Sequence, residues 1–417
     1  FRSAKGEVHA YQFYPAVMFS HARLTYTQVA AALSNTRGPE AAALGERVPD
    51  LLNLHDVFRA LLQARQKRGV VDLDTVETQI ITDDAGRIEK ILPRTRNDAH
   101  RLIEEAMLAA NVCAAQFIAE HKHLGLYRVH DGPTPEKVEL LRQYLRVLGL
   151  NLSVSDEPRP EEFQAISAAT HERPDHEQVH TMLLRSMSQA IYSPINDGHF
   201  GLAYEAYTHF TSPIRRYPDL LVHRVIKAIL QAKPYHLPQL PEPGDAHEQM
   251  GKRLAARNQR LGRVPHTAGN EAGKSLKASK ARKSKGHAEL QDWEAAGLHC
   301  SANERRADEA SRDVEAWLKC KYMREHLGEE YGGVVSAATS FGIFVTLDAM
   351  YVEGLVHITE LGGEYFKFDE ARQELRGERT GIRYSIGTRV RVQVSRVDLD
   401  SRKIDFRMVK EGGESQR

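Results

Sequence analysis

The chain has 417 residues, of which 41% are hydrophobic and 27% charged, so it is long enough for a large core and more than one globular unit. Its formal net charge is only +1, which excludes nucleic-acid binding by a global excess of cations and requires any such site to be local. The three cysteines, at positions 113, 300 and 320, lack the spacing of metal ligands, and no apolar run reaches the ~20 residues of a membrane span. We therefore expect a cytoplasmic protein with reduced thiols and no membrane partner.

The first predicted elements are strands and one helix. Residues 8–25 alternate in the manner of strands, and because this pattern is already under way at Phe1 we expect more of the same sheet upstream. Leucines at helical spacing predict a helix over 47–68. Two strands are expected within 70–92, around an Asp-Asp-Ala-Gly sequence at 83–86. We interpret its two aspartates as turn residues rather than metal ligands.

Helices dominate the next part of the chain. Asn97 is a suitable N-cap for a long amphipathic helix from residue 98 to about residue 120. Shorter helices are predicted over 135–148 and 178–192, and a further helix ends near Leu230.

The composition changes sharply after residue 230. Prolines cluster between 234 and 243, and residues 251–285 then contain eleven lysines and arginines against a single acid. This composition predicts a mobile basic insertion that grips RNA without sequence preference, although plain solubilising disorder explains it equally well. A helix is expected to return over 304–327. The short strands with glycine punctuation over 331–408 are typical of a small barrel.

The most chemically distinctive stretch covers residues 209–220 and reads HFTSPIRRYPDL. Pro213 and Pro218 each suit the first position of a helical turn. Backbone donors at a helix start attract anions, and the guanidinium groups of Arg215 and Arg216 can fork onto phosphate. We interpret this stretch as a phosphate clamp. The plainer alternative is a helix cap with two solvated arginines.

Two further patterns point to nucleic acid. In the long predicted helix, Glu104 and Asn111 are seven residues apart and share a face, with Glu105 one helical step round. In the strand-rich region, Phe341 and Phe344 lie on a hairpin reading SFGIFV, and exposed aromatics of this kind stack on bases. Solvated carboxylates and core aromatics are the plainer alternatives.

These blocks resemble the RNB (ribonuclease II) family of 3′→5′ exoribonucleases. The resemblance rests on SHARLTY at 20–26, EEAMLAAN at 104–111, TSPIRRY at 211–217 and ERRADEA at 304–310. The order GVV, FGIFV and GLVH within 331–408 is similar to an RNA-binding domain of the ribosomal-protein-S1 type. The implied fold is a portion of an α+β catalytic (RNB) domain followed by a small all-β OB-fold (S1-type) barrel. Overall, the blocks look most similar to the branch of the family that digests structured RNA.

The resemblance also implies roles for single residues. Arg215 would be a catalytic residue that stabilises charge on the scissile phosphate, with Arg216 as its helper or as a structural pair. Glu105, or else Glu104, would accept a hydrogen bond from a ribose 2′-hydroxyl and so select RNA over DNA. The remaining RNA-binding side chains would be Tyr217, Glu304, Phe341, Phe344, His357, Asp398 and Arg402. For Tyr217 packing is the alternative role, and for Glu304 it is that of a helix-start acid.

The implied domain organisation has five parts. Residues 1–230 form the RNB portion, 231–290 a proline-rich and then basic insertion, and 291–328 a helix that completes the catalytic domain. Residues 329–410 form the S1-type domain, and 411–417 a tail.

The metal site of the family has no counterpart in this sequence. RNB enzymes cleave with Mg²⁺ held by an aspartate cluster of the pattern GxDAxDxDD. The aspartate pairs at 72/74, 83/84 and 398/400 do not match that pattern. We therefore expect no metal ligands in this chain, and Mg²⁺ as the cofactor of an intact enzyme whose cluster lies upstream.

By resemblance the protein is a processive hydrolytic exoribonuclease of RNA turnover and quality control. It would degrade single-stranded and structured RNA to nucleoside 5′-monophosphates, and it would work as a monomer. One alternative is a catalytically inactive RNA-binding fragment. The other is an adaptor that serves the ribosome or the RNA-decay machinery through its S1-type barrel.

Overall fold

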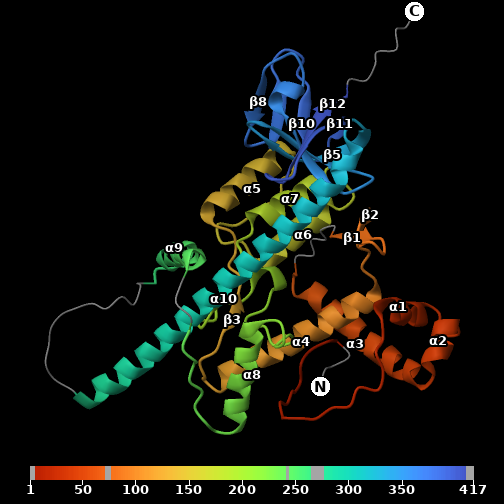
Figure 1. Ribbon diagram of the computed structural model, residues 1–417. Helices are drawn as coiled ribbons and strands as arrows, with labels where there is room; N and C mark the ends of the chain where they lie inside the picture. Colours follow the sequence, from red (N-terminus) through yellow and green to blue (C-terminus); the bar gives the residue numbers. More distant parts are fainter. Residues whose placement is uncertain (1–4, 71–76, 241–243, 264–276, 410–417) are drawn as a thin grey trace, which may run out of the picture.

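The computed structural model describes residues 5–70, 77–240, 244–263 and 277–409. A helical part and a small β-barrel are joined by one long helix, α10, and the barrel lies at the top of the view (Figure 1). The helices are α1 (Tyr26–Ser34), α2 (Pro39–Leu44), α3 (Val48–Lys67), α4 (Asp98–Glu120), α5 (Pro135–Val147), α6 (Pro160–Thr170), α7 (His176–Ser186), α8 (Tyr217–Leu230), α9 (Asp245–Arg260) and α10 (Lys277–Met323). The strands outside the barrel region are β1 (Thr78–Thr82), β2 (Ile88–Pro93), β3 (Tyr127–Val129) and β4 (Ile191–Ser193).

The beginning of the chain differs from the sequence prediction. Residues 9–25 carry no regular secondary structure and belong to no sheet in the part of the chain that the structure describes, so the predicted strands are wrong. An alternating pattern favours extended backbone, but a strand also needs a neighbour, and here Val17 and Met18 are 103% and 92% exposed. The segment ends at Thr25, whose side chain accepts the backbone N–H of Gln28 and begins α1.

The next elements follow the prediction closely. The predicted helix over 47–68 is α3, and β1 and β2 pair antiparallel around a turn in which Asp83 accepts the N–H of Arg87 at 2.8 Å. The Asn97 side chain accepts the N–H of His100 at 3.2 Å and so caps α4. By length and composition alone α4 could cross a membrane, but its residues contact α3 and α8 within the protein and 56% of its most apolar window is buried.

The middle of the chain forms two cores. Helices α5, α6 and α7 pack around Leu141, Phe163 and Leu183. Strands β3 and β4 pair antiparallel beside α4 and α8, and this second core includes Trp293 of α10. The predicted helix over 178–192 is shorter than expected, because α7 ends at Ser186 and the chain then enters β4.

Part of the segment expected to be a mobile insertion is folded. Residues 245–260 form α9, and its Arg257 donates to both carboxylate oxygens of Asp131, at 2.7 and 2.8 Å, and to Asp197 at 2.6 Å. The lysine- and arginine-rich composition did not reveal these acidic partners, which lie at least 60 residues upstream. Residues 264–276, in the middle of the basic segment, lie outside the described residues. The helix expected to begin at residue 304 is the last part of α10, which starts at residue 277.

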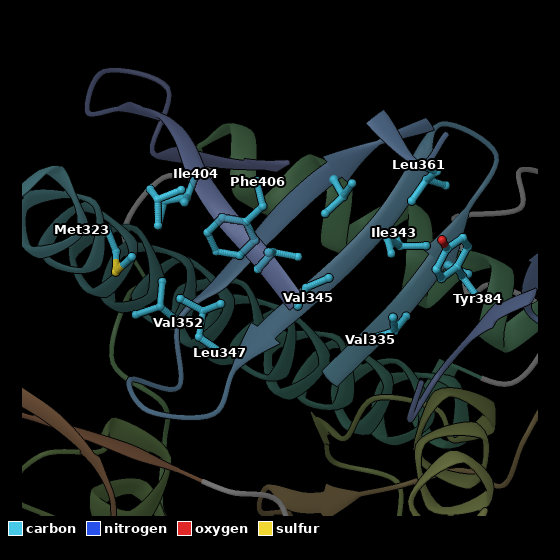
Figure 2. Packing of buried hydrophobic residues seen from close by; sticks show 14 of the residues in the cluster. Met323, Val335, Ile343, Val345, Leu347, Val352, Leu361, Tyr384, Ile404 and Phe406 are labelled. Carbon is cyan, nitrogen blue, oxygen red and sulfur yellow. The ribbon is translucent and has the colours of Figure 1, made fainter. Parts of the chain in front are cut away.

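The C-terminal region is a closed five-stranded barrel, as predicted. Its strands are β5 (Glu330–Thr339), β6 (Gly342–Leu347), β7 (Glu353–His357), β11 (Arg389–Asp398) and β12 (Lys403–Met408), and β12 pairs with β7 in parallel. Between β7 and β11 the chain forms a separate sheet of β8 (Phe366–Asp369), β9 (Glu374–Gly377) and β10 (Arg383–Ser385). Figure 2 shows Met323, from the end of α10, beside Val352, Ile404 and Phe406 of the barrel core.

Candidate active site and nucleic-acid interface

The predicted phosphate clamp forms the turn that starts α8. Pro218 occupies the first turn of this helix, and Asp219 beside it is fully buried. Asp219 Oδ1 accepts the backbone N–H of Ser212 at 2.7 Å and Nη2 of Arg216 at 2.8 Å. Arg216 is therefore tied into the turn, which favours the structural one of the two roles expected for it.

Arg215 has the opposite surroundings. Its side chain is exposed, next to the fully exposed Ile214, and it makes no ion pair with any residue that the structure describes. Three buried polar atoms in the same turn lack a hydrogen-bond partner among the described residues: Thr211 Oγ1, Arg216 Nε and Asp219 Oδ2. Such atoms are rare in folded proteins, and each calls for an explanation such as a functional role.

A second cluster lies around Glu304 on α10. Arg128 of β3 donates to Glu304 Oε2 at 2.7 Å, and the same guanidinium lies 4.6 Å from the ring centroid of Tyr192 in β4. The Tyr192 hydroxyl contacts His209 Nδ1 at 2.8 Å and donates to Glu304 Oε1 at 3.3 Å. Burial, followed by the positive charges of Arg216 and Arg128, lowers the pKa of His209 to about 2, so this ring is neutral.

The two glutamates of the EEAMLAAN block differ in burial and in the arginine with which each one pairs. Glu104 is half-buried and forms an ion pair with Arg96. Glu105 is only 5% exposed and its Oε1 accepts from Arg65 Nη1 of α3 at 2.9 Å. The sequence suggested solvated carboxylates as the plain alternative, whereas Glu105 is a buried, paired group. Asn111 is also buried and accepts the backbone N–H of Phe210 at 2.9 Å, which joins α4 to the clamp.

On the barrel, the predicted RNA-binding residues are only partly brought together. Phe341 is 48% exposed and meets Phe344 edge-on, with 6.1 Å between ring centroids. His357 is exposed and pairs across the strands with Gly342, beside these rings. Asp398 accepts backbone N–H groups within the β11–β12 turn, and Arg402 forms a 3.4 Å ion pair with Asp313 of α10.

Several residues of the site were not found from the sequence. Arg65, Arg128 and Tyr192 carry no recognisable motif, and their partners are between 17 and 176 residues away. Arg65 lies in the last turn of α3 and Arg68 caps its end three residues later, a spacing that is a weak signal for a paired role. Arg68 stacks on the Tyr204 ring at 4.1 Å and donates to its hydroxyl at 2.9 Å.

The carboxylates of this site do not fit a magnesium ion. Among the described residues no group of three histidine, cysteine, aspartate or glutamate side chains converges. Each acid of the site is engaged by an arginine, in the pairs Glu105–Arg65, Asp219–Arg216 and Glu304–Arg128. Asp83, Asp84 and Asp400 belong to hairpin turns, Asp398 is the last residue of β11 beside such a turn, and the pair at 72/74 lies outside the described residues.

Comparison with known proteins identifies both parts of the chain. The RNB domain model matches residues 2–232, and the S1 RNA-binding domain model matches residues 326–408. The chain is 41% identical over 409 residues to ribonuclease R of Escherichia coli and 44% identical over 411 residues to ribonuclease R of Vibrio cholerae. Both alignments cover 98% of this chain but only 45% of the relative.

The fold agrees with a solved relative as well. Mycoplasma genitalium RNase R in complex with ribose-methylated single-stranded RNA matches with a TM-score of 0.76 and 25% identity, over 97% of this chain and 56% of that one. This chain therefore spans about half the length of the proteins that it matches. Sequence and fold together show that the chain belongs to the RNB family, with an RNB portion followed by an S1 RNA-binding domain.

Proposed function

We propose that this chain is the RNA-gripping part of a processive, hydrolytic 3′→5′ exoribonuclease that degrades single-stranded and structured RNA to nucleoside 5′-monophosphates. The observation that supports this most is the exposed guanidinium of Arg215, held on the turn that begins α8 and beside a buried polar cluster. In a chain of the RNB family, this arrangement is suited to a phosphate of the RNA backbone.

The rigid turn explains how Arg215 can act on a phosphate. The Arg216–Asp219 pair and the Ser212–Asp219 hydrogen bond fix the backbone that carries Arg215. The backbone at Arg215 is thus fixed while its exposed side chain can extend to a phosphate, so Arg215 stabilises the negative charge that develops on the scissile phosphate.

The buried Glu105 and the half-buried Glu304 position the RNA in this proposal. Glu105 Oε1 is held by Arg65, so we assign the ribose 2′-hydroxyl to Glu105 Oε2. Glu304 is held by Arg128 on one side and Tyr192 on the other, and it acts from α10 on the same strand of RNA. Tyr217 is 37% exposed at the start of α8 and contributes a ring surface.

The barrel supplies a second RNA-binding surface in this proposal. Phe341, Phe344 and His357 stack on bases, and the ion pair of Arg402 with Asp313 sets the position of its guanidinium beside them. Asp398 acts indirectly, by fixing the β11–β12 turn next to Arg402.

RNB nucleases are generally dependent on a divalent metal ion, and we assign Mg²⁺ to the intact enzyme. The paired carboxylates described above do not hold it, so no step of this proposal involves the ion. We place the protein in the cytoplasm as a monomer, with RNA as its partner. The ribosome and the RNA-decay machinery are the macromolecular contacts proposed beyond RNA.

A catalytically inactive RNA-binding chain is the second candidate function. One observation favours it, namely that every carboxylate of the described site is already paired with an arginine. This chain alone then grips RNA without cleaving it.

One experiment tests both candidates. The chain is incubated with a 5′-labelled single-stranded RNA, with and without Mg²⁺, and both retention and the product ladder are measured. Mg²⁺-dependent shortening from the 3′ end supports the exoribonuclease in this chain alone. Salt-sensitive retention without shortening supports the RNA-gripping part. Absence of both contradicts the proposal. Arg215→Met is expected to weaken retention, whereas the control Arg224→Met, an exposed arginine on α8, leaves it unchanged.

A further inference from the structure

A groove of about 640 Å³ lies between α10 and the side of the barrel that carries Phe341 and Phe344. Its wall on α10 includes Arg312 and Lys319, which the sequence analysis did not associate with RNA. Beyond Tyr351 a second hollow of about 570 Å³ shares Lys319 with the first and reaches the β1–β2 hairpin. The barrel face is thus one wall of a passage rather than an open surface.

Packing fixes the width of this groove. Cys320 and Met323 of α10 and Ile91 of β2 are buried in the same cluster as the barrel core, so the opposing walls belong to one packed unit. Figure 2 shows Met323 beside Val352 and Ile404 of the barrel. Two polar contacts also join α10 to its neighbours here, since Arg402 pairs with Asp313 at 3.4 Å and Thr78 donates to Glu315 at 2.8 Å.

The chemistry of the two walls is complementary in the way that a nucleotide requires. The barrel wall offers the 48% exposed ring of Phe341, and a base can stack on such a surface. The helix wall offers the exposed guanidinium of Arg312 and the ammonium of Lys319. The Lys319 ammonium also pairs with Glu315 of the same wall at 2.8 Å, and both cations attract phosphate. Glu353 and Asp405 in the groove are acceptors for base amino groups or a 2′-hydroxyl. The volume is within the range of small-molecule sites.

We propose that α10 forms the second wall of the RNA site, with Arg312 and Lys319 holding backbone phosphates of a single strand whose bases stack on Phe341 and Phe344. This inference rests on the proposed function in one respect, namely that RNA is the ligand. It adds a binding site on α10 that the barrel alone does not provide. The strand continues past Tyr351 toward the β1–β2 hairpin.

The test compares matched variants of the whole chain. Lys319→Met and Arg312→Met keep the aliphatic stems and remove the charges. Lys321→Met is the control, because Lys321 lies two residues from Lys319 and its ammonium stays 5.5 Å from the Trp317 ring, outside the groove lining. Fluorescence anisotropy with a labelled oligouridine gives the Kd at several salt concentrations.

Each groove variant is expected to lower the slope of log Kd against log salt by ~0.7, as one phosphate contact is lost from a single strand. Lys321→Met leaves the slope unchanged. Phe341→Ala separates this inference from the proposed function. If Phe341→Ala weakens binding while both groove variants behave like Lys321→Met, α10 is not a wall of the site and the proposed function stands. If none of the variants affects RNA binding, the proposed use of the barrel face fails as well.

A second measurement does not depend on the stability of any variant. RNA containing 4-thiouridine is crosslinked by light to the unmodified chain, and the crosslinked peptides are mapped. Crosslinks are expected both in the barrel peptide that contains Phe341 and in the α10 peptide that spans residues 312–320. Crosslinks confined to the barrel peptide overturn the inference.

Discussion

Arg215 and Arg216 are neighbours in the chain with contrasting surroundings. Arg216 is 20% exposed in its side chain and neutralises the fully buried Asp219, whereas Arg215 points into solvent. The sequence motif identified both arginines but did not distinguish them, because their difference depends on which one reaches Asp219. Arg65 and Arg128 were missed altogether, since only the folded chain brings them to Glu105 and Glu304.

The two arginines are therefore expected to respond differently to substitution. Arg216→Met leaves a buried carboxylate without its cation and is expected to lower the free energy of unfolding by roughly 3 kcal/mol. Arg215→Met removes no intramolecular pair and is expected to change it by less than ~0.5 kcal/mol. Urea unfolding of both variants checks this, and equal losses of stability would contradict the assigned roles.

His209 makes the free energy of unfolding depend on pH in a direction that can be predicted. Its pKa is lowered to about 2 in the folded state by burial and nearby arginines, and burial lowers that of His199 to about 3. The unfolded chain protonates these rings below about pH 6.5, and the folded chain does not, so stability is lost as the pH falls below that value. Each ring contributes a slope of up to ~1.4 kcal/mol per pH unit.

His209→Gln is accordingly expected to flatten the loss of stability between pH 6.5 and pH 5. Unfolding by urea at several pH values measures the slope, with His9→Gln, an exposed position, as the control. A His209→Gln slope equal to that of the unmodified chain would show that His209 is charged in the folded state.

At the scale of elements, prediction succeeded where the signal is local. The α4 helix was predicted from the Asn97 cap and its apolar stripe, and the β1–β2 hairpin from its turn residues. It failed where the deciding partner is remote. Segment 9–25 has the sequence pattern of a strand but belongs to no sheet among the described residues. Helix α9 is held by acidic residues that a composition profile does not connect to it.

The position of α9 is expected to depend on the hydrogen bonds that the Arg257 guanidinium donates to Asp131 and Asp197. A guanidinium contacts both oxygens of Asp131 and also Asp197, which a lysine ammonium cannot reproduce. In Arg257→Lys, the amides of α9 are expected to exchange hydrogen faster by at least about tenfold, while those of α4 keep their protection. Arg253→Lys, an exposed change on the same helix, serves as the control. Unchanged exchange in Arg257→Lys would mean that other contacts hold α9.

At the scale of the whole molecule, the barrel and the RNB portion share one core. Ile91 from the β1–β2 hairpin and Met323 from α10 are both buried among barrel residues. The domain order could be predicted from the sequence, whereas this shared core could not. Each residue that contributes to it has the pattern of an ordinary apolar position in its own helix or strand.

Met323→Ala is expected to destabilise the barrel and the RNB portion together. The substitution opens a cavity at a fully buried position and costs about 2–5 kcal/mol. Calorimetry is expected to show one shared transition moving to lower temperature. Two transitions, of which only one moves, would show that the parts unfold independently.

The length of α10 has a consequence for the RNA itself. Glu304 and Lys319 lie on one uninterrupted helix, fifteen residues apart, and at 1.5 Å per residue they are separated by about 22 Å along its axis. The helix therefore fixes the distance between the groove at Lys319 and the cluster around Glu304. Under the proposed function, an RNA fragment too short to span that distance is expected to contact only one of the two proposed sites at a time. A longer strand is expected to gain the second contact without a second association cost.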